Sequence, residues 1–411
     1  MSAPAGPVAV LSHTHPSVSK GGAEIAAHTL FQGLRRLGVP AIFVAAVPRR
    51  LAAEVVPGGP DEHVLLHDEE RYDHFFNLGD PALAAELAAL LRARGVALAC
   101  FHHFLNFGAG ALRAVRQGLG IPTFLVLHEF LAMCAHHGQM VTRPARLLCP
   151  AATPLRCLRC FPEGGIDQVA ARHDLMREAL GLMDGLVAPS AFLAGRFAGW
   201  GLPPGRIAVI ENGLAGFDGL VPPPRPADGK AVIGVFGQLT PFKGLNTVLD
   251  AADLLAAEPE LAARLEIRLH GLLVGQEPAF AARFEEALRR HPFLRFAGPY
   301  ENEGVRRLMA ATDAVLVPST WWENSPLVIQ EAYAAGRPVI CSGIGGMAEK
   351  VPEGVAGLHF EPGSAAGLLG ALRDFAARPA GGWALPAPLD EREMAARYLR
   401  AFGMGAARPR D

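Results

Sequence analysis

The sequence predicts an α/β protein of two doubly wound domains, each built around a mainly parallel sheet. The chain has 411 residues, which is too long for a single domain with one hydrophobic core of ordinary size. Short apolar runs rich in β-branched residues alternate with segments of helical period, a pattern typical of βαβ units. This alternation restarts after the proline-rich stretch 221–226, which we interpret as the linker between the two domains.

The expected strands fall into two sets. The first set is PVAVLS, AIFVAA, ALACFHH, TFLVLHE, GLVAPS and IAVIENG, and the second is AVIGVFG, LEIRLHG, LRFAGPY, AVLVPS, PVICSG and GLHFEPG. We therefore expect an N-terminal domain over 1–215, a C-terminal domain over 216–385, and a helix in 386–411 that packs back on the N-terminal domain. Ligands of doubly wound sheets lie beyond the carboxyl ends of the strands, so two such domains facing each other predict a central cleft.

Composition excludes several classes of protein. Half of the residues are hydrophobic and 19% are charged, as in well-packed globular chains and unlike disordered ones. The net charge of −2 gives little electrostatic support for binding nucleic acid. No apolar stretch approaches the length of a membrane span, and the first residues do not resemble a signal peptide. We expect a cytoplasmic protein, with peripheral contact at the inner face of the membrane as an open alternative.

Two loops that follow strands contain glycine and lysine. In SKGGAE, Gly21 and Gly22 would let the backbone approach an anion at the start of a helix, although an ordinary strand-to-helix turn has the same appearance. In FGQLTPFKG, Lys243 would lie at the mouth of the cleft and meet a diphosphate as a point charge. The alternative for Lys243 is a solvated surface lysine.

The stretch ENSPLVIQE predicts a loop that leads into a helix running from about Ser325 to Ala335. Pro326 suits the first helical turn because its missing N–H needs no partner there. Either Asn324 or Ser325 would cap the helix.

Two glutamates, Glu323 and Glu331, bracket the start of this helix. Eight helical residues rise about 12 Å, whereas the two carboxyl groups of a glycosidase lie about 5 to 9.5 Å apart. The spacing therefore argues against hydrolysis and favours two contacts along one elongated ligand. The free N–H groups of Leu327 and Val328 would meet the negative middle of that ligand. The alternative is two surface glutamates.

Together FGQLTPFKG, VLVPSTWWENSPLVIQEAYAAGRPVICSGIGGMAEKV and SKGGAE resemble the family-4 glycosyltransferases. The resemblance implies the GT-B fold of two Rossmann-like domains and a transfer that retains the anomeric configuration. It implies a UDP- or GDP-linked nucleotide sugar as donor, held mainly by the second domain. It implies a sugar, a lipid-linked molecule or another hydroxyl compound as acceptor, held mainly by the first domain.

The resemblance also assigns roles to residues. It implies that Glu331 binds the ribose hydroxyls, that Glu323 holds hydroxyls of the donor sugar, and that Lys243 clamps the diphosphate while Gly21 and Gly22 close over it. Further donor contacts are implied for the backbone of Asn324, Ser325, Leu327 and Val328, and for the base near Gly298, Pro299 and Tyr300. One residue departs from the family pattern. Gln238 stands where members commonly carry an arginine, so one cation of the diphosphate clamp is missing unless Lys20 or a nearby arginine replaces it.

Histidines follow several strands of the first domain. The resemblance implies that His128, in LVLHEF, lies beside the reacting sugar, although a histidine at a strand end is otherwise more often structural. His102 and His103 at the end of another strand are candidates for the acceptor side, as are His13 and His15 after the first strand.

Cysteines cluster in an insert over 134–160. Cys134, Cys149, Cys157 and Cys160 end in a C-x-x-C, which in a cytoplasmic chain indicates a structural zinc site before disulfides. Only one C-x-x-C is present, however, and His136 or His137 could replace a ligand. Free thiols that hold a loop in place are the equal alternative.

The sequence thus predicts a metal-independent glycosyltransferase of glycan, polysaccharide or glycoconjugate biosynthesis. A GT-B phosphorylase or epimerase and a non-catalytic nucleotide-sugar-binding subunit are the alternatives. His128, Glu323 and Lys243 are the expected catalytic residues.

Overall fold

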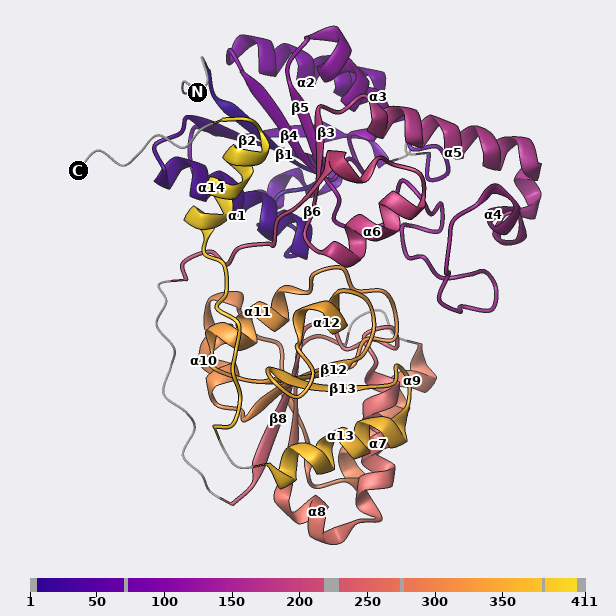
Figure 1. The fold of residues 1–411 in the computed structure, drawn as a ribbon, viewed down its shortest axis with the longest axis vertical. Helices are drawn as coiled ribbons and strands as arrows, with labels where there is room; N and C mark the ends of the chain where they lie inside the picture. Colours follow the sequence, from indigo (N-terminus) through magenta and orange to yellow (C-terminus); the bar gives the residue numbers. More distant parts are fainter. Residues whose placement is uncertain (1–5, 70–72, 218–228, 274–276, 379–380, 405–411) are drawn as a thin grey trace. The chain divides into compact units, whose positions relative to one another are not determined.

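The computed structural model describes residues 6–69, 73–217, 229–273, 277–378 and 381–404. The chain separates into two compact units, unit 1 (Met1–Gly216 and Leu389–Asp411) and unit 2 (Phe217–Pro388), which are shown together in Figure 1. The proline-rich stretch 221–226 lies outside the described residues. None of the described helices is long and apolar enough to cross a membrane.

Unit 1 contains a parallel sheet of seven strands in the order β3-β2-β1-β4-β5-β6-β7. The strands are β1 (Val8–Ser12), β2 (Ala41–Pro48), β3 (Glu62–His67), β4 (Leu98–His102), β5 (Thr123–Val126), β6 (Gly185–Ala188) and β7 (Ile207–Val209). The α-helices are α1 (Gly22–Arg36), α2 (Pro81–Ala93), α3 (Gly108–Arg113), α4 (Pro154–Cys160), α5 (Gly165–Gly181), α6 (Ala191–Gly199) and α14 (Glu391–Ala401). The sheet order reverses direction between β1 and β4, which is the point where doubly wound folds bind their ligands.

The C-terminal helix α14 packs against α1 in unit 1 (Figure 1). Its apolar face buries Met394 and Tyr398 in the same core as Phe31 of α1 and Phe43 of β2. The two helices approach closely at Gly33, where a Cβ atom would lie 2.1 Å from the carbonyl oxygen of Glu391. A residue with a side chain at Gly33 would therefore force the two helices apart.

Unit 2 contains a parallel sheet of six strands in the order β10-β9-β8-β11-β12-β13. The strands are β8 (Ala231–Phe236), β9 (Leu265–His270), β10 (Leu294–Gly298), β11 (Ala314–Val317), β12 (Val339–Ser342) and β13 (Gly357–Phe360). The helices are α7 (Leu245–Ala256), α8 (Pro259–Arg264), α9 (Pro278–Arg290), α10 (Val305–Ala310), α11 (Leu327–Ala334), α12 (Gly345–Lys350) and α13 (Ala365–Ala377). Here the order reverses between β8 and β11.

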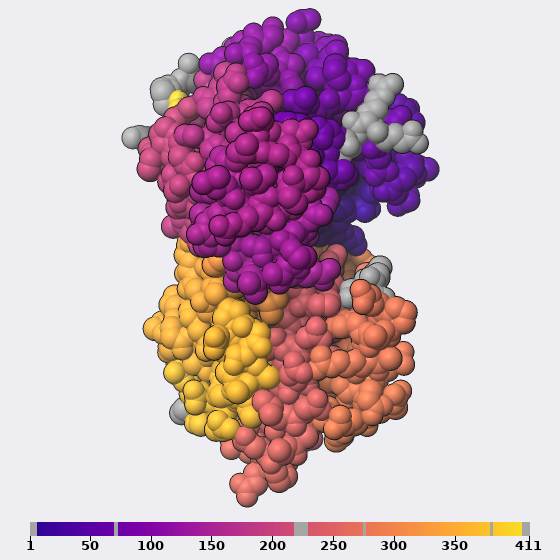
Figure 2. Space-filling view, turned by 90° about the vertical axis from the view of Figure 1, so that its right-hand side faces the viewer, coloured from indigo at the N-terminus to yellow at the C-terminus, as the bar shows by residue number. Residues whose placement is uncertain are grey.

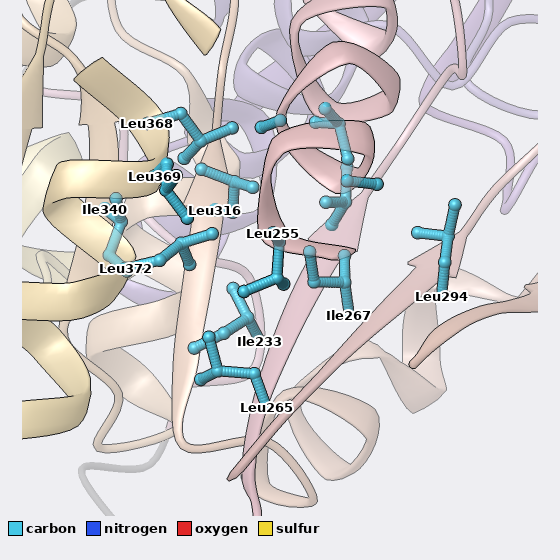
Figure 3. Packing of buried hydrophobic residues seen from close by; sticks show 14 of the residues in the cluster. Ile233, Leu255, Leu265, Ile267, Leu294, Leu316, Ile340, Leu368, Leu369 and Leu372 are labelled. Atoms are coloured by element: carbon cyan, nitrogen blue, oxygen red, sulfur yellow. The ribbon is translucent and has the colours of Figure 1, made fainter. Parts of the chain in front are cut away.

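Hydrophobic side chains cover both faces of the unit 2 sheet because they alternate along each strand. On β11, Leu316 faces the cluster formed with α7 and α13, whereas Val315 and Val317 face the cluster formed with α10, α11 and α12. Figure 3 shows the first cluster, with Leu255 of α7 and Leu372 of α13 among the labelled side chains that pack on the strands. A strand buried on both faces explains the continuous apolar runs seen in the sequence.

The expected strands all occur, and of the thirteen strands in the described residues only β3 was missed. Its sequence EHVLLH begins and ends with polar residues, and it lies at the edge of the sheet, where only half of its residues are buried. The expected start of the helix in ENSPLVIQE was wrong. α11 begins at Leu327, and Pro326 occupies the N-cap in an extended conformation (ψ 119°).

Candidate functional site

The loops after β8 and β11 lie side by side at the carboxyl edge of the unit 2 sheet, because these two strands are neighbours at the reversal point. Phe242 and Trp321, one from each loop, stack with ring centroids 5.4 Å apart at 16°. The Thr320 N–H donates to the Phe242 carbonyl oxygen at 2.9 Å. The two loops therefore form one continuous surface, and Lys243 and Glu323 lie on it.

Lys243 and Glu323 form a close ion pair. The Lys243 Nζ atom lies 2.6 Å from Glu323 Oε1, and the same oxygen accepts hydrogen bonds from Ser319 Oγ at 2.8 Å and Trp321 Nε1 at 2.9 Å. Burial acts to raise the pKa of Glu323, but the charge of Lys243 and these donors outweigh it, so the pKa is lowered. Glu323 is thus an ionised carboxylate with one crowded oxygen.

Glycines allow the backbone to hold this pair. Gly244 has φ +82°, and a Cβ atom there would lie 1.8 Å from the Pro318 carbonyl oxygen. A Cβ atom at Gly346 would lie 1.9 Å from the Asn324 carbonyl oxygen, and the Gly346 N–H donates to the Glu323 carbonyl oxygen at 2.7 Å. Larger residues at Gly244 or Gly346 would displace the loop that carries Glu323.

The N-terminus of α11 lies directly after this loop. Its first N–H groups, at Leu327 and Val328, make no hydrogen bond within the described residues, whereas the Ile329 N–H donates to the Pro326 carbonyl oxygen at 3.1 Å. Free N–H groups at a helix start attract anions. Asn324 and Ser325 lie in the loop between Glu323 and this helix, half-buried like their neighbours.

Glu331 lies one helical turn further along α11. Burial raises the pKa of its carboxyl group to about 7. No hydrogen bond to this carboxylate occurs within the described residues. Tyr300 is close enough for the Glu331 charge to raise the pKa of its phenol further, after the larger effect of burial. An unpaired, half-buried carboxylate is a site that hydroxyl donors would satisfy.

Aromatic rings lie near the ends of β8, β9 and β10. Phe236 stacks on His270 at 4.6 Å and contacts Tyr300 edge-on at 5.9 Å. The residues expected near the base, Gly298, Pro299 and Tyr300, directly follow or end β10.

Gln238 follows β8 and is exposed.

In unit 1, histidines gather at the carboxyl ends of the neighbouring strands β1, β4 and β5. His102 Nδ1 lies 3.0 Å from His128 Nε2, and the rings of His13 and His103 lie 4.6 Å apart. Burial, followed by the neighbouring His102, holds the pKa of His128 well below its usual value. Burial alone lowers the pKa of His102 to about 3. Both rings are therefore neutral, and His128 can donate or accept a hydrogen bond.

The side chain of His102 is held in place by packing against α14. It is fully buried, and its ring stacks on Tyr398 of α14 with centroids 5.8 Å apart at 19°. The C-terminal helix thereby supports the residue that contacts His128.

The other histidine candidates have separate partners. His13 Nε2 lies 3.5 Å from Glu24 Oε1, and His103 Nε2 lies 3.1 Å from Glu129 Oε1. His15 is held elsewhere, since its Nε2 lies 3.1 Å from a carboxylate oxygen of Glu62 on β3. The structure therefore brings His13, His102, His103 and His128 together and uses His15 to tie β1 to β3.

The SKGGAE loop already places a carboxyl group, that of Glu24, at the start of α1. Ser19 Oγ donates to Glu24 Oε1 at 2.6 Å, and burial raises the pKa of Glu24 despite this hydrogen bond. Gly21 precedes α1 in an extended conformation, Gly22 opens it, and Lys20 is exposed beside them. A phosphate at this helix start would meet the Glu24 carboxyl group.

Sequence reasoning missed several groups of the site: Glu24, Glu129, Ser319 and Trp321. Glu24 and Glu129 each lie within a motif that was recognised, SKGGAE and LVLHEF, and adjacency to the strand-end histidine His128 was the signal available for Glu129. Ser319 and Trp321 act through hydrogen bonds to Glu323 that depend on how the loop folds.

The four clustered cysteines line one cavity of about 210 Å³ in the segment between β5 and α5. All are free thiols, and burial followed by the neighbouring thiols raises the pKa of Cys157 to about 11. α4, which carries Cys157 and Cys160, packs beside α5 away from the sheet (Figure 1), and Figure 2 shows the magenta part of unit 1 that includes this segment at the surface. Within the described residues, no group of three or more His, Cys, Asp or Glu side chains is arranged to hold a metal ion. The residues as placed do not fit a zinc site.

Two family models match the chain. The model described as Glycosyltransferase Family 4 matches residues 20–215, and the model described as Glycosyl transferases group 1 matches residues 230–378. The D-inositol 3-phosphate glycosyltransferase of Geodermatophilus obscurus is 31% identical over 191 residues, which cover 44% of this chain and 42% of that protein. The glycogen synthase of Mycobacterium tuberculosis is 32% identical over 181 residues, which cover 43% of this chain and 41% of that protein. The matches span about half or less of the length of these curated relatives.

Solved structures share the fold over nearly the whole chain. HepE from Anabaena, in complex with UDP and glucose, has a TM-score of 0.62 at 18% identity, covering 97% of this chain and 99% of that one. Sucrose-phosphate synthase from Thermosynechococcus elongatus has a TM-score of 0.67 at 19% identity, covering 97% of this chain and 94% of that one. The fold is GT-B, with two Rossmann-like units. The chain belongs to the family-4 glycosyltransferases.

Proposed function

We propose that the chain is a retaining glycosyltransferase that moves a sugar from a UDP- or GDP-linked donor to a hydroxyl acceptor in glycan, polysaccharide or glycoconjugate biosynthesis. The observation that carries the proposal is the Lys243–Glu323 pair beside the free N-terminus of α11, at the reversal point of the unit 2 sheet. The names of the curated relatives, a glycosyltransferase and a glycogen synthase, support transfer of a sugar.

The proposed donor site extends along α11. The diphosphate binds between Lys243 and the N–H groups of Leu327 and Val328, where cation and helix dipole compensate its charge. Glu323 accepts hydrogen bonds from sugar hydroxyls through the oxygen that Lys243 does not contact. Glu331 accepts them from the ribose, and the base lies near Tyr300.

The proposed reaction breaks the bond between the anomeric carbon and the diphosphate oxygen. The acceptor oxygen forms its bond to the same face of that carbon, and its proton passes to the departing diphosphate. Lys243 and the helix N-terminus stabilise the negative charge that develops on the leaving group. Gln238 contributes a neutral hydrogen bond where an arginine would contribute a charge. His128, neutral and held by His102, contacts the reacting sugar.

The proposed transfer needs no metal, since cationic and N–H groups of unit 2 supply the compensation for the diphosphate. The cysteine segment shapes the surface near the acceptor side and takes no part in bond making. Metal analysis of the purified protein tests this point, since the arrangement of free thiols predicts no bound zinc and one zinc per chain would contradict it.

A thermal-shift screen with nucleotide sugars tests donor binding, because a ligand at about 100 times its Kd stabilises by about 2.7 kcal/mol. Release of nucleoside diphosphate is then compared with and without acceptor. Release that depends on acceptor supports a transferase, release without acceptor supports a phosphorylase or epimerase, and binding without turnover supports a non-catalytic subunit. The anomeric configuration of the product, measured by NMR, tests retention. If Glu331→Ala leaves donor affinity unchanged, the proposed ribose contact is wrong.

A further inference from the structure

A second cavity lies at the carboxyl edge of the unit 1 sheet. It measures about 310 Å³, which is within the range of small-ligand sites. Of the residues that line it, His67 ends β3, His103 directly follows β4, and Glu129 lies three residues after β5. The cavity is therefore placed where doubly wound sheets bind ligands, and it is formed entirely by unit 1.

The contacts of His103 fix the position of the Glu129 carboxylate in the cavity. The Leu105 N–H donates to His103 Nδ1 at 2.9 Å, so Nδ1 is an acceptor and the ring proton is on Nε2. The Nε2 atom lies 3.1 Å from Glu129 Oε1. The second oxygen, Oε2, is buried and has no hydrogen-bond partner within the described residues. The backbone of His103 has φ +86°, a strained conformation that positions the ring. Glu129 is thus a fixed hydrogen-bond acceptor with unused capacity.

The rest of the lining also offers groups that pair with hydroxyls. The side-chain N–H groups of Asn106 donate to backbone carbonyl oxygens, which leaves its Oδ1 free to accept. His67 and His137 line the cavity, and burial, the largest effect on each, lowers their pKa values, so both rings are neutral at pH 7. Glu69 adds a second carboxylate, paired with Arg50 at the rim.

We propose that this cavity binds the acceptor and that the acceptor part it takes is polyhydroxylated and carries no anionic group. Hydroxyl donors satisfy Glu129 and Asn106, whereas a phosphate would meet the carboxylate of Glu129, and none of the described residues that line the cavity is a lysine or an arginine that could compensate its charge. The inference rests on the proposed function, since it names the substrate class of the acceptor side. Glu129 is an acceptor-binding residue here, and His103 positions it.

Matched pairs of acceptors test the inference in the full-length protein. Glucose is compared with glucose 6-phosphate, and myo-inositol with inositol 3-phosphate, in the presence of the donor found by thermal shift. Acceptor-dependent release of nucleoside diphosphate gives KM for each. We expect at least one uncharged compound to act, with a KM about tenfold or more below that of its phosphorylated partner.

Two variants sharpen the test. Glu129→Gln keeps the shape and is expected to raise the acceptor KM about tenfold or more, with the donor thermal shift unchanged. Leu105→Lys places a cation in the cavity and is expected to lower the KM for the phosphorylated probe. Glu178→Gln changes an exposed glutamate of α5 and is expected to match the unmodified protein.

The outcomes distinguish failure of the proposed glycosyltransferase function from failure of the inference about the acceptor. Absence of any donor shift overturns the proposed function, and the acceptor inference falls with it. A donor shift combined with preference for phosphorylated acceptors overturns the acceptor inference alone. So does a donor shift with no response to any uncharged compound, or an acceptor KM that Glu129→Gln leaves unchanged.

Discussion

Glu331 predicts how donor binding depends on pH. Burial raises the pKa of its carboxyl group from 4.5 to about 7. At about 1.4 kcal/mol per unit, ionising Glu331 in the unliganded fold costs about 3 kcal/mol more than in water. Because the folded pKa is the higher one, the folded state binds the extra proton, and this group's contribution to stability falls as pH rises from about 4.5 to about 7. Ribose hydroxyls that donate to Glu331 require the ionised form.

Donor affinity is therefore expected to fall in acid. The ionised fraction of Glu331 is about 90% at pH 8 and about 10% at pH 6, so the Kd rises roughly tenfold between them and roughly a hundredfold by pH 5. Isothermal titration with UDP-glucose, without acceptor, measures this dependence, since the diphosphate diester does not titrate in that range. If another nucleotide sugar gives the larger thermal shift, it replaces UDP-glucose.

Glu331→Gln is the matched control, since it keeps the shape and removes the titration. Its affinity should be weaker than that of the unmodified protein at pH 8 and nearly constant with pH. Any slope that remains in the variant belongs to other groups. The reasoning is refuted if both proteins show the same pH dependence, or if the unmodified protein binds more tightly as pH falls.

Three further substitutions test the geometry. Gly244→Ala should lower the free energy of unfolding by more than about 2 kcal/mol in denaturant titrations, because the positive φ of Gly244 and a nearby carbonyl oxygen both oppose a Cβ atom. The control is Gly304→Ala, where a Cβ atom meets open space and the free energy of unfolding should change by less than about 0.5 kcal/mol. Equal effects of the two substitutions would contradict the predicted clash at Gly244. Lys243→Met should raise the pKa of Glu323 and lower kcat about 100-fold in the diphosphate-release assay; a purely structural lysine would leave kcat of the folded variant unchanged. Arg172→Met removes the donor to three backbone carbonyl oxygens and should cost about 3 to 5 kcal/mol of stability by denaturation, and a loss below about 1 kcal/mol would count against it.

The sequence allowed most of the architecture to be predicted because most of its strands are short and buried on both faces. In such strands most positions are apolar, and the resulting runs stand out against the helical segments between them. β3 was missed for the opposite reason, since this edge strand is only partly buried and has the polar residues Glu62 and His67 at its ends, which interrupt the apolar run. The start of α11 was placed too early because the sequence shows which residues can cap but not that Pro326 adopts an extended ψ.

The candidate site was predictable where its residues follow strands in one recognisable motif. Lys243 and Glu323 come from two motifs 80 residues apart, and the sheet order brings them within 2.6 Å. The pairing of His103 with Glu129 could not be predicted in the same way. It depends on β4 and β5 being neighbours and on the positive φ of His103, neither of which a local pattern encodes.

The two glutamates of ENSPLVIQE have opposite pKa shifts, and opposite shifts in a carboxylate pair often indicate an acid and a base. Here the causes argue otherwise. Glu323 is ionised because Lys243, Trp321 and Ser319 all donate hydrogen bonds to one of its carboxylate oxygens. The same hydrogen bonds make that oxygen a poor base. Glu331 has a raised pKa only because it is buried without a donor, as a hydroxyl-binding carboxylate is before its ligand arrives. A ligand that donates to Glu331 would lower its pKa, whereas a general acid must keep it raised during turnover. The pH dependence of donor binding therefore separates these two roles.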